Sequence, residues 1–223
     1  MNVVRNYDHL VDLLKFKFKY GKQGDNNSRV AGLLFAQPNS FTKDEILSGI
    51  DYFNNRSEKF IDFFCVGYQP AFFQPNYPKL TTVGGCDWSF NPKIFNELRR
   101  QTEERSNWKY SGSVELVLFN SYLDKTTDTV KLDFSDSIAI DLKQAKENKL
   151  ISSVGELFER IFSISEKIST DNPAKEMSLK LIGDTGKKSI VNILFNLLPK
   201  AIQDDSKKIY LFGTENYDKK PSH

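Results

Sequence analysis

Two apolar runs, VAGLLFA at residues 30–36 and IDFFCVG at residues 61–67, set the architecture that this sequence predicts. Each run has the length of a strand and lacks a regular polar alternation, which is typical of strands buried on both faces of a sheet. Residues 38–40 (PNS) end the first run, and Thr42 with Glu45 three residues later forms the capping-box pattern that starts a connecting helix. Strand, helix and strand make a βαβ unit with parallel strands.

The other patterns extend this unit into one α/β domain over residues 1–223, with a central mixed sheet and flanking helices. The expected elements are a helix at residues 7–20, a helix at 92–105, strands at 114–119 and 129–134, a short strand or helix lead at 137–142, a helix at 152–168, a strand at 177–182, a helix at 188–202 and a strand at 209–212. This places the core at about residues 30–168, a C-terminal extension at about 174–212 and a polar tail at 213–223.

The expected order over residues 30–168 is β-α-β-α-β-β-α, which resembles the order of the thioredoxin-like fold. The resemblance is one of topology, because the residues that carry the chemistry of that family are missing. QPNS at residues 37–40 stands where a CxxC would follow the first strand, and no proline comes directly before Val114, where the family has its cis-proline. The resemblance therefore implies a fold and no redox activity.

Composition narrows the class of protein. Lys and Arg number 31 against 29 Asp and Glu, a net charge of +2, so any site for nucleic acid or an anionic membrane must be a local patch. The N-terminus lacks the pattern of a signal peptide, and no apolar run is long enough to span a membrane. The 2 cysteines are too few for a disulfide framework. We therefore expect a cytoplasmic protein without a membrane segment, a metal or a cofactor.

The 18 Phe are more than one core usually needs, and the excess of aromatic residues, counting Tyr and Trp as well, concentrates in residues 68–88. This stretch shows no periodicity and is expected to be a long loop, either a lid on the sheet or an interface. Exposed aromatic side chains dominate protein interfaces, so the leading hypothesis is a non-catalytic protein that binds another protein as one component of a multi-gene system. The candidate anchors are Phe72, Phe73, Tyr77, Trp88, Trp108 and Tyr110.

Two catalytic alternatives remain open. Cys86 lies shortly before the helix expected from residue 91, where a helix N-terminus would favour a reactive thiolate. The order Pro78, Thr82, Cys86 is similar to the peroxiredoxin active-site pattern, but one residue too many separates the threonine from the cysteine. The sequence therefore allows a thiol enzyme without indicating one.

The second alternative is a divergent magnesium-dependent nuclease. Asp133 on one expected strand and the pair Asp141 and Lys143 on the next are similar to the PD-(D/E)xK pattern, in which two acids bind Mg²⁺ and the lysine positions water. The same spacing also arises on a solvent-facing edge strand. Histidine catalysis is not expected, because His9 and His223 are the only histidines.

Two further patterns could bind anions. Residues 183–189 (GDTGKKS) resemble a Walker A loop, although a lysine stands where the motif needs its second glycine. A weak anion site there would use Gly183, Gly186, Lys187, Lys188 and Ser189. A nucleic acid could meet the basic, aromatic stretch near the N-terminus through Lys15, Lys17, Lys19 and Lys22. The favoured interpretation of that stretch is an amphipathic helix with its lysines in water.

Overall fold

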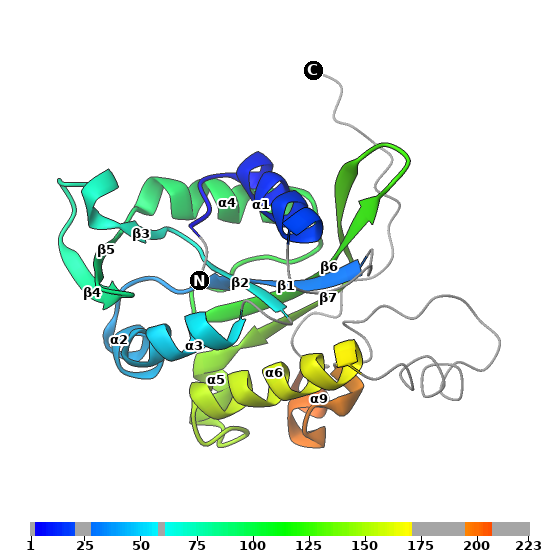
Figure 1. Ribbon diagram of the computed structural model, residues 1–223. Coiled ribbons are helices and arrows are strands. Elements are labelled where there is room, and N and C mark those ends of the chain that lie inside the picture. The colour runs from blue at the N-terminus through cyan, green and yellow to red at the C-terminus, as the bar shows by residue number, and fades with distance from the viewer. Residues whose placement is uncertain (1–2, 21–27, 58–60, 171–194, 207–223) are drawn as a thin grey trace.

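The computed structural model describes residues 3–20, 28–57, 61–170 and 195–206 (Figure 1). Within these ranges the chain forms a four-stranded mixed sheet with helices against both faces, and a smaller three-stranded sheet to one side. The predicted α/β class with a central mixed sheet is confirmed. The predicted strands at residues 177–182 and 209–212, and the first part of the helix predicted at 188–202, lie outside the described residues. In the described part of that helix, residues 198–199 are not helical, and a new helix begins at Lys200.

The main sheet has the strand order β2-β1-β6-β7. Its strands are β1 (Ser28–Phe35), β2 (Ile61–Cys65), β6 (Glu115–Asp124) and β7 (Thr129–Asp141). β1 and β2 are parallel, as the βαβ pattern predicts, whereas β6 is antiparallel to both β1 and β7. The strand expected at 129–134 and residues 137–141, expected as part of a short strand or a helix lead, form one long strand. Its pairing with β6 shifts register between Leu118 and Asn120.

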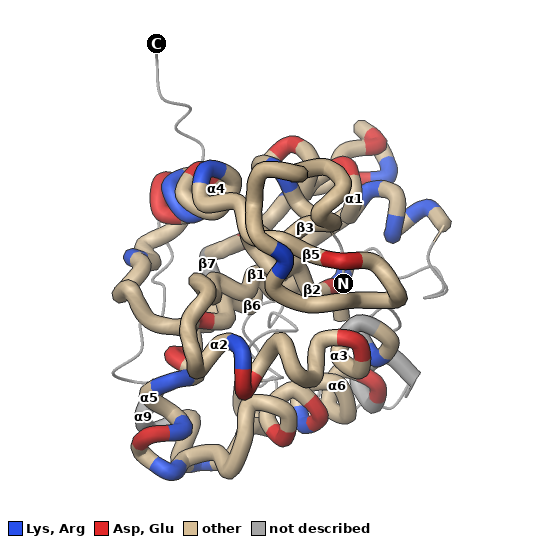
Figure 2. The backbone as a smooth tube through the Cα atoms, turned by 90° about the vertical axis from the view of Figure 1, so that its left-hand side faces the viewer, with Lys and Arg blue, Asp and Glu red and all other residues tan. Residues whose placement is uncertain are grey.

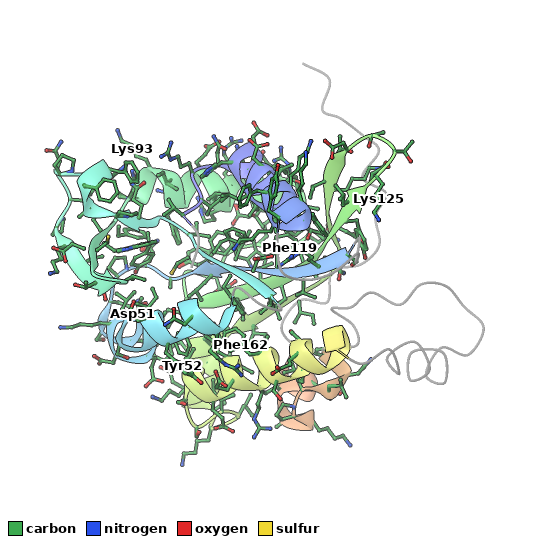
Figure 3. The ribbon with its side chains drawn as sticks, in the orientation of Figure 1. Asp51, Tyr52, Lys93, Phe119, Lys125 and Phe162 are labelled. Carbon is green, nitrogen blue, oxygen red and sulfur yellow. The ribbon has the colours of Figure 1, made fainter. Side chains whose placement is uncertain are left out.

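Helices cover both faces of this sheet (Figure 1). One face carries α1 (Tyr7–Tyr20) and α4 (Pro92–Glu104), and the other carries α2 (Ser40–Glu45), η1 (Leu47–Gly49), α3 (Ile50–Ser57), α5 (Leu142–Glu147), α6 (Val154–Thr170) and α9 (Lys200–Ser206). Successive strand residues alternate between the two layers, so Leu33 packs toward α1 and α4 while Leu34 packs toward α6. Figure 3 labels one aromatic residue of each layer, Phe119 and Phe162.

The start of the connecting helix differs from the predicted capping box. Asn39 is the N-cap of α2, and its side chain accepts a hydrogen bond from Thr42 N at 2.8 Å. The Thr42 hydroxyl is buried and donates to Gln37 O at 2.7 Å, while Glu45 forms an ion pair with Lys146 of α5. Asn caps helices as well as Ser or Thr does, and here the N-cap lies three residues earlier than the predicted Thr42.

The prediction of a long loop over residues 68–88 is wrong. After β2 the chain forms β3 (Tyr68–Pro70), the short 3-10 helix η2 (Ala71–Phe73), β4 (Lys79–Val83) and β5 (Cys86–Phe90). These strands make an antiparallel sheet of order β3-β5-β4, which we call the small sheet. The strands are short and interrupted by proline, so tertiary packing rather than local periodicity determines them.

The chain enters the small sheet from the main sheet, and leaves it again, at one junction. Asn91 N donates to Gly67 O at 2.7 Å, so the chain leaves and returns at neighbouring points. Gly67 has φ +85°, and a Cβ there would lie 2.8 Å from the Phe90 ring and 3.1 Å from Asn91 O. Only glycine fits this position, because both the backbone conformation and the space exclude a side chain.

The added strands and α5 make the order of elements longer than the predicted one. The assignment to the thioredoxin-like fold therefore stays a prediction.

Candidate functional site: an exposed aromatic pair

The small sheet holds two phenylalanines at the surface. Phe72 is 68% exposed and Phe73 is 53% exposed, and their ring centroids are 4.2 Å apart. Both belong to η2, which Pro70 precedes and which ends with Gln74 N donating to Ala71 O at 2.9 Å. Large apolar side chains at the surface cost free energy in water, so a pair of them calls for an explanation.

The structure beneath the pair is rigidly attached to the core. Tyr68, Val83 and Trp88 of the small sheet are buried and belong to the same apolar cluster as α3 and α6. At the β4–β5 turn, Gly84 N donates to Asp51 Oδ1 of α3 at 2.7 Å, and Figure 3 shows Asp51 beneath this sheet. The Phe72–Phe73 pair is thus held in place by the core rather than carried by an unanchored loop.

The surface around the pair is poor in charge. Residues 68–90 carry Lys79 and Asp87 as their only charged side chains, in a protein that is 27% charged. These two form an ion pair at 2.7 Å, which lowers the pKa of Asp87. Figure 2, which views the molecule from the side of the small sheet, shows this segment as mostly uncharged. Depletion of charge around exposed aromatic residues is typical of the centre of a protein interface.

A second exposed aromatic pair, Phe16 and Tyr20 on α1, has a local explanation. The two side chains are 59% and 65% exposed, with ring centroids 4.9 Å apart. Residues spaced i and i+4 are neighbours on a helix surface and stabilise their own helix when both are apolar. Phe72 and Phe73 are consecutive in a single 3-10 turn and gain no such stabilisation, so the two pairs are not equivalent.

The other predicted aromatic anchors are less accessible. Trp88 and Trp108 are buried and present no face to a partner, while Tyr77 and Tyr110 are half-buried. Trp108 packs 4.6 Å from the Phe35 ring, measured between centroids, and its indole nitrogen donates to Glu115 at 2.6 Å. These tryptophans belong to the core, which sequence position alone did not reveal.

Glu115 is a buried carboxylate that the sequence did not single out. Besides Trp108, it accepts from the backbone N–H of Ser111 at 2.8 Å and from the Ser111 hydroxyl. Burial raises the pKa of Glu115, against these hydrogen bonds, which lower it, and burial also raises the pKa of Tyr110 to about 12. By accepting these hydrogen bonds, the Glu115 carboxylate holds the segment that connects α4 to β6 in place. We call Trp108, Ser111 and Glu115 the Glu115 cluster.

The structure does not bring the nuclease candidates together. Asp133 pairs with Asn120 and Asp141 pairs with Glu115, so the two acids lie five residues apart along β6, about 17 Å at 3.4 Å per residue. Asp141 caps α5 and accepts from Ser113 at 2.8 Å, and Lys143 lies 3.8 Å from Glu147. In the described ranges, no three His, Cys, Asp or Glu side chains are placed to hold a metal ion.

Cys86 does not lie at a helix N-terminus. It is exposed and begins β5, directly after the turn at Gly84 and Gly85, opposite Val83 of β4. Asn91, not a thiol, caps α4 by accepting from Lys93 N and Ile94 N. At QPNS, where the resemblance places a redox centre, the Asn39 side chain caps α2 and the Gln37 carbonyl accepts from the Thr42 hydroxyl. No nucleophile with an adjacent base is found at either place among the described residues.

The basic stretch at the N-terminus is partly neutralised. Lys15 pairs with Asp128 at 2.8 Å, and Lys17 lies 3.9 Å from the buried Asp62, which also binds Arg29 at 2.9 Å. Lys19 lies over the Tyr20 ring, 5.9 Å from its centroid. Two of the three described lysines of this stretch, Lys15 and Lys17, therefore lie beside acids that offset their charge. Lys22 and the anion-site candidates Gly183, Gly186, Lys187, Lys188 and Ser189 lie outside the described residues.

Comparison with protein-family models, curated proteins and solved structures yields no match. Among the described helices, none is both long enough and apolar enough to cross a membrane.

Proposed function

We propose that this chain is a non-catalytic cytoplasmic protein that binds another protein through the Phe72–Phe73 pair. The observation that carries the proposal is the exposure of two adjacent phenylalanines, 68% and 53%, on a sheet anchored in the core. Aromatic residues fixed in place lose little conformational entropy on binding, which makes them efficient interface anchors. The low content of charged side chains in residues 68–90 supports the same conclusion.

Two further properties fit this proposal. Cys65 and Cys86 are both free thiols, as is usual in a reducing compartment. The catalytic alternatives lack support from the described side chains, because the nuclease residues are apart and Cys86 has no activating helix terminus. A protein that acts by binding, as one component of a multi-gene system, needs none of that chemistry.

The test is site-specific photo-crosslinking in the native cell. A photoreactive phenylalanine analogue at position 72 should crosslink to one reproducible protein, whereas the same analogue at position 16 should not. The purified partner should then bind the wild-type chain, and the double variant Phe72→Ala/Phe73→Ala should weaken binding by about 100-fold or more. Phe16→Ala is the matched control, because Phe16 is similarly exposed. Equal binding by the double variant and the control would refute the proposal.

A further inference from the structure

Arg5 lies over the exposed aromatic pair although it is far away in the sequence. Its guanidinium carbon is 5.4 Å from the centroid of the Phe73 ring, and the residue is exposed. An arginine stacked on a ring keeps the N–H groups along its edge available for hydrogen bonds. The surface formed by Phe72, Phe73 and Arg5, which we call the aromatic–arginine patch, therefore combines apolar area with one positive charge.

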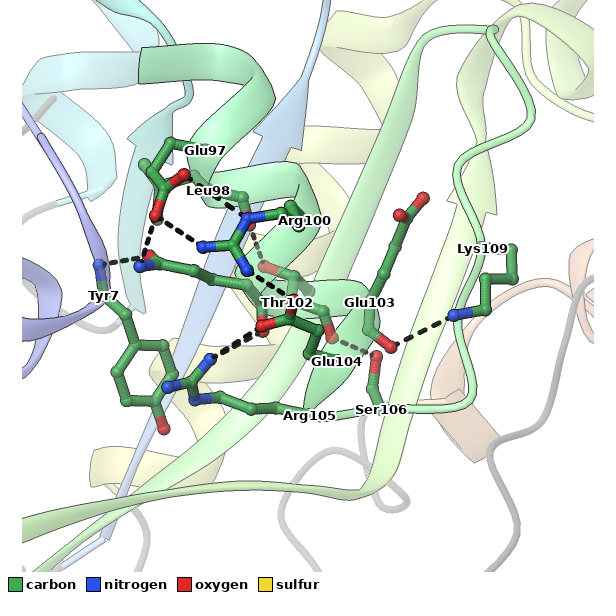
Figure 4. A network of polar contacts seen from close by, with 11 residues as sticks. Tyr7, Glu97, Leu98, Arg100, Thr102, Glu103, Glu104, Arg105, Ser106 and Lys109 are labelled. Carbon is green, nitrogen blue, oxygen red and sulfur yellow. Dashed lines mark hydrogen bonds and ion pairs between the residues drawn. The ribbon is translucent and has the colours of Figure 1, made fainter. Parts of the chain in front are cut away.

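Contacts of the residues before and after Arg5 hold its backbone in place. Val4, directly before it, is buried in the cluster that includes α1 and α4. Tyr7 N donates to the Gln101 side chain of α4 at 2.9 Å, and Arg105 of the same helix lies 4.1 Å from the centroid of the Tyr7 ring (Figure 4). Arg5 N itself donates to His9 Nδ1 at 3.2 Å. The backbone of Arg5 is thus held where its side chain reaches the Phe73 ring.

Arg5 is the one arginine that has no carboxylate partner in the described part of the chain, which contains all the arginines of the sequence. The six others form ion pairs: Arg29 with Asp62, Arg56 with Glu159, Arg99 with Glu103, Arg100 with Glu97 and Glu104, Arg105 with Glu104, and Arg160 with Glu156. Figure 4 shows part of this pattern on α4. A guanidinium group can donate two parallel hydrogen bonds to one carboxylate, so the lack of a carboxylate partner in the described chain distinguishes Arg5 from the other arginines.

We infer that the aromatic–arginine patch binds a peptide segment with an apolar side chain and a nearby carboxylate, the apolar side chain on Phe72 and Phe73 and the carboxylate on Arg5. The inference rests on the proposed function and adds the chemistry of the partner. Residues 68–90 supply no competing acid, because their single acidic side chain, Asp87, is paired with Lys79. Charge complementarity of this kind determines which partner is chosen.

A nucleic acid or an anionic membrane fits the patch less well. Phosphate backbones and anionic lipids are held by several cations acting together. Arg5 is a single charge, and Lys79, the only lysine of the small sheet, is already paired. One arginine beside two aromatic rings suits one carboxylate on a protein segment.

The test is selection of a phage-displayed library of random 12-residue peptides on the full-length chain. We expect the selected peptides to share an aromatic or aliphatic residue within about three positions of Asp or Glu. Their binding should fall by about tenfold for Arg5→Gln and by more for Phe72→Ala/Phe73→Ala. Lys43→Glu is the matched control, since Lys43 is an exposed cation of α2, on the opposite face of the main sheet.

Charge reversal gives the sharpest readout. Selection on Arg5→Glu should replace the acidic residues of the peptides with Lys or Arg, whereas selection on Lys43→Glu should leave them acidic. Apolar peptides without acids, lost in Phe72→Ala/Phe73→Ala, would overturn the inference and leave the proposed function standing. Peptides that bind independently of Phe72 and Phe73 would refute both.

The test also includes measurements of binding to other ligands and of self-association. Arg5-dependent binding to phosphatidylserine vesicles or to a single-stranded oligonucleotide, stronger than binding to any selected peptide, would overturn the inference. Self-association in sedimentation that disappears in Phe72→Ala/Phe73→Ala would also overturn it, because the occupant would then be a second copy of the chain.

Discussion

Trp108 and Phe72 are both aromatic residues outside the regular patterns of the sequence, yet the first is fully buried and the second is 68% exposed. Around Trp108 the polar groups satisfy one another, with the indole N–H and the groups of Ser111 all directed at Glu115. Around Phe72 and Phe73 the apolar surface is uncovered, and Arg5 has no carboxylate partner in the described chain. The polar groups of the first region satisfy one another, whereas the second region leaves apolar area and a guanidinium exposed, which is the basis of the proposed binding site.

The largest effect expected from this difference concerns stability. Trp108→Ala should lower the free energy of unfolding by about 3–5 kcal/mol, because it leaves a cavity beside Phe35 and removes a donor to Glu115. Phe72→Ala should change it by less than about 0.5 kcal/mol. Urea denaturation of both variants measures the two values. A large loss for Phe72→Ala would show that the exposed pair supports the fold.

The second largest effect is the loss of stability expected when the buried carboxylate of Glu115 is removed. Glu115→Ala should destabilise the protein by about 2–3 kcal/mol, because the Trp108 and Ser111 donors would lose their acceptor in a buried site. Arg5→Ala should leave the stability almost unchanged, since its guanidinium contacts only an exposed ring. If Arg5→Ala cost as much as Glu115→Ala, Arg5 would be a structural residue.

A smaller effect is the pH dependence that Glu115 contributes. Its pKa is raised in the folded state, so the folded protein binds a proton more readily than the unfolded chain does. The stabilisation from the protonated carboxyl is present below the unfolded pKa of about 4.5 and is lost as the pH rises through the folded value. Relative to Glu115→Gln, the wild type should therefore lose stability between about pH 4 and neutral pH. Parallel curves for the two proteins would contradict this expectation.

The smallest effect reports on Arg5 directly. Burial lowers the pKa of His9, and the positive charge of Arg5 lowers it further. Arg5→Gln removes the second influence, so the His9 pKa should rise toward the usual 6.5, while Lys43→Glu should not move it. NMR titration can follow this because the chain has only two histidines. A partner carboxylate bound at Arg5 should raise the same pKa.

The sequence predicts the main sheet and its helices well because their signals are local. Continuous apolar runs specify β1 and β2, and the Asn91-Pro92 pair specifies the start of α4. The small sheet was missed because its strands have only 3 to 5 residues and its apolar side chains face a core built elsewhere in the chain. One signal was present: adjacent glycines at 84 and 85, between residues suited to strands, are typical of a two-residue hairpin turn.

The candidate site could be predicted only in part. Phe72 and Phe73 stand out in the sequence as aromatic residues without a periodic role, but so do Trp88 and Trp108, which are buried. Arg5 lies 68 positions before Phe73, and its lack of a carboxylate partner is known only when the partners of every other arginine are known. Exposure and charge pairing are properties of the folded chain, and no local pattern encodes them.

The junction between Gly67 and Asn91 has a consequence for how such a protein can diverge. Because residues 68–90 leave and rejoin the fold at the Gly67–Asn91 hydrogen bond, the exposed segment around η2, between β3 and β4, can change in length without disturbing the register of β1 and β2. What must persist is the glycine at the junction and large apolar side chains at the positions of Tyr68 and Trp88. Under the proposed function, this exposed segment is where the same scaffold would acquire a different recognition surface while the main sheet stays the same.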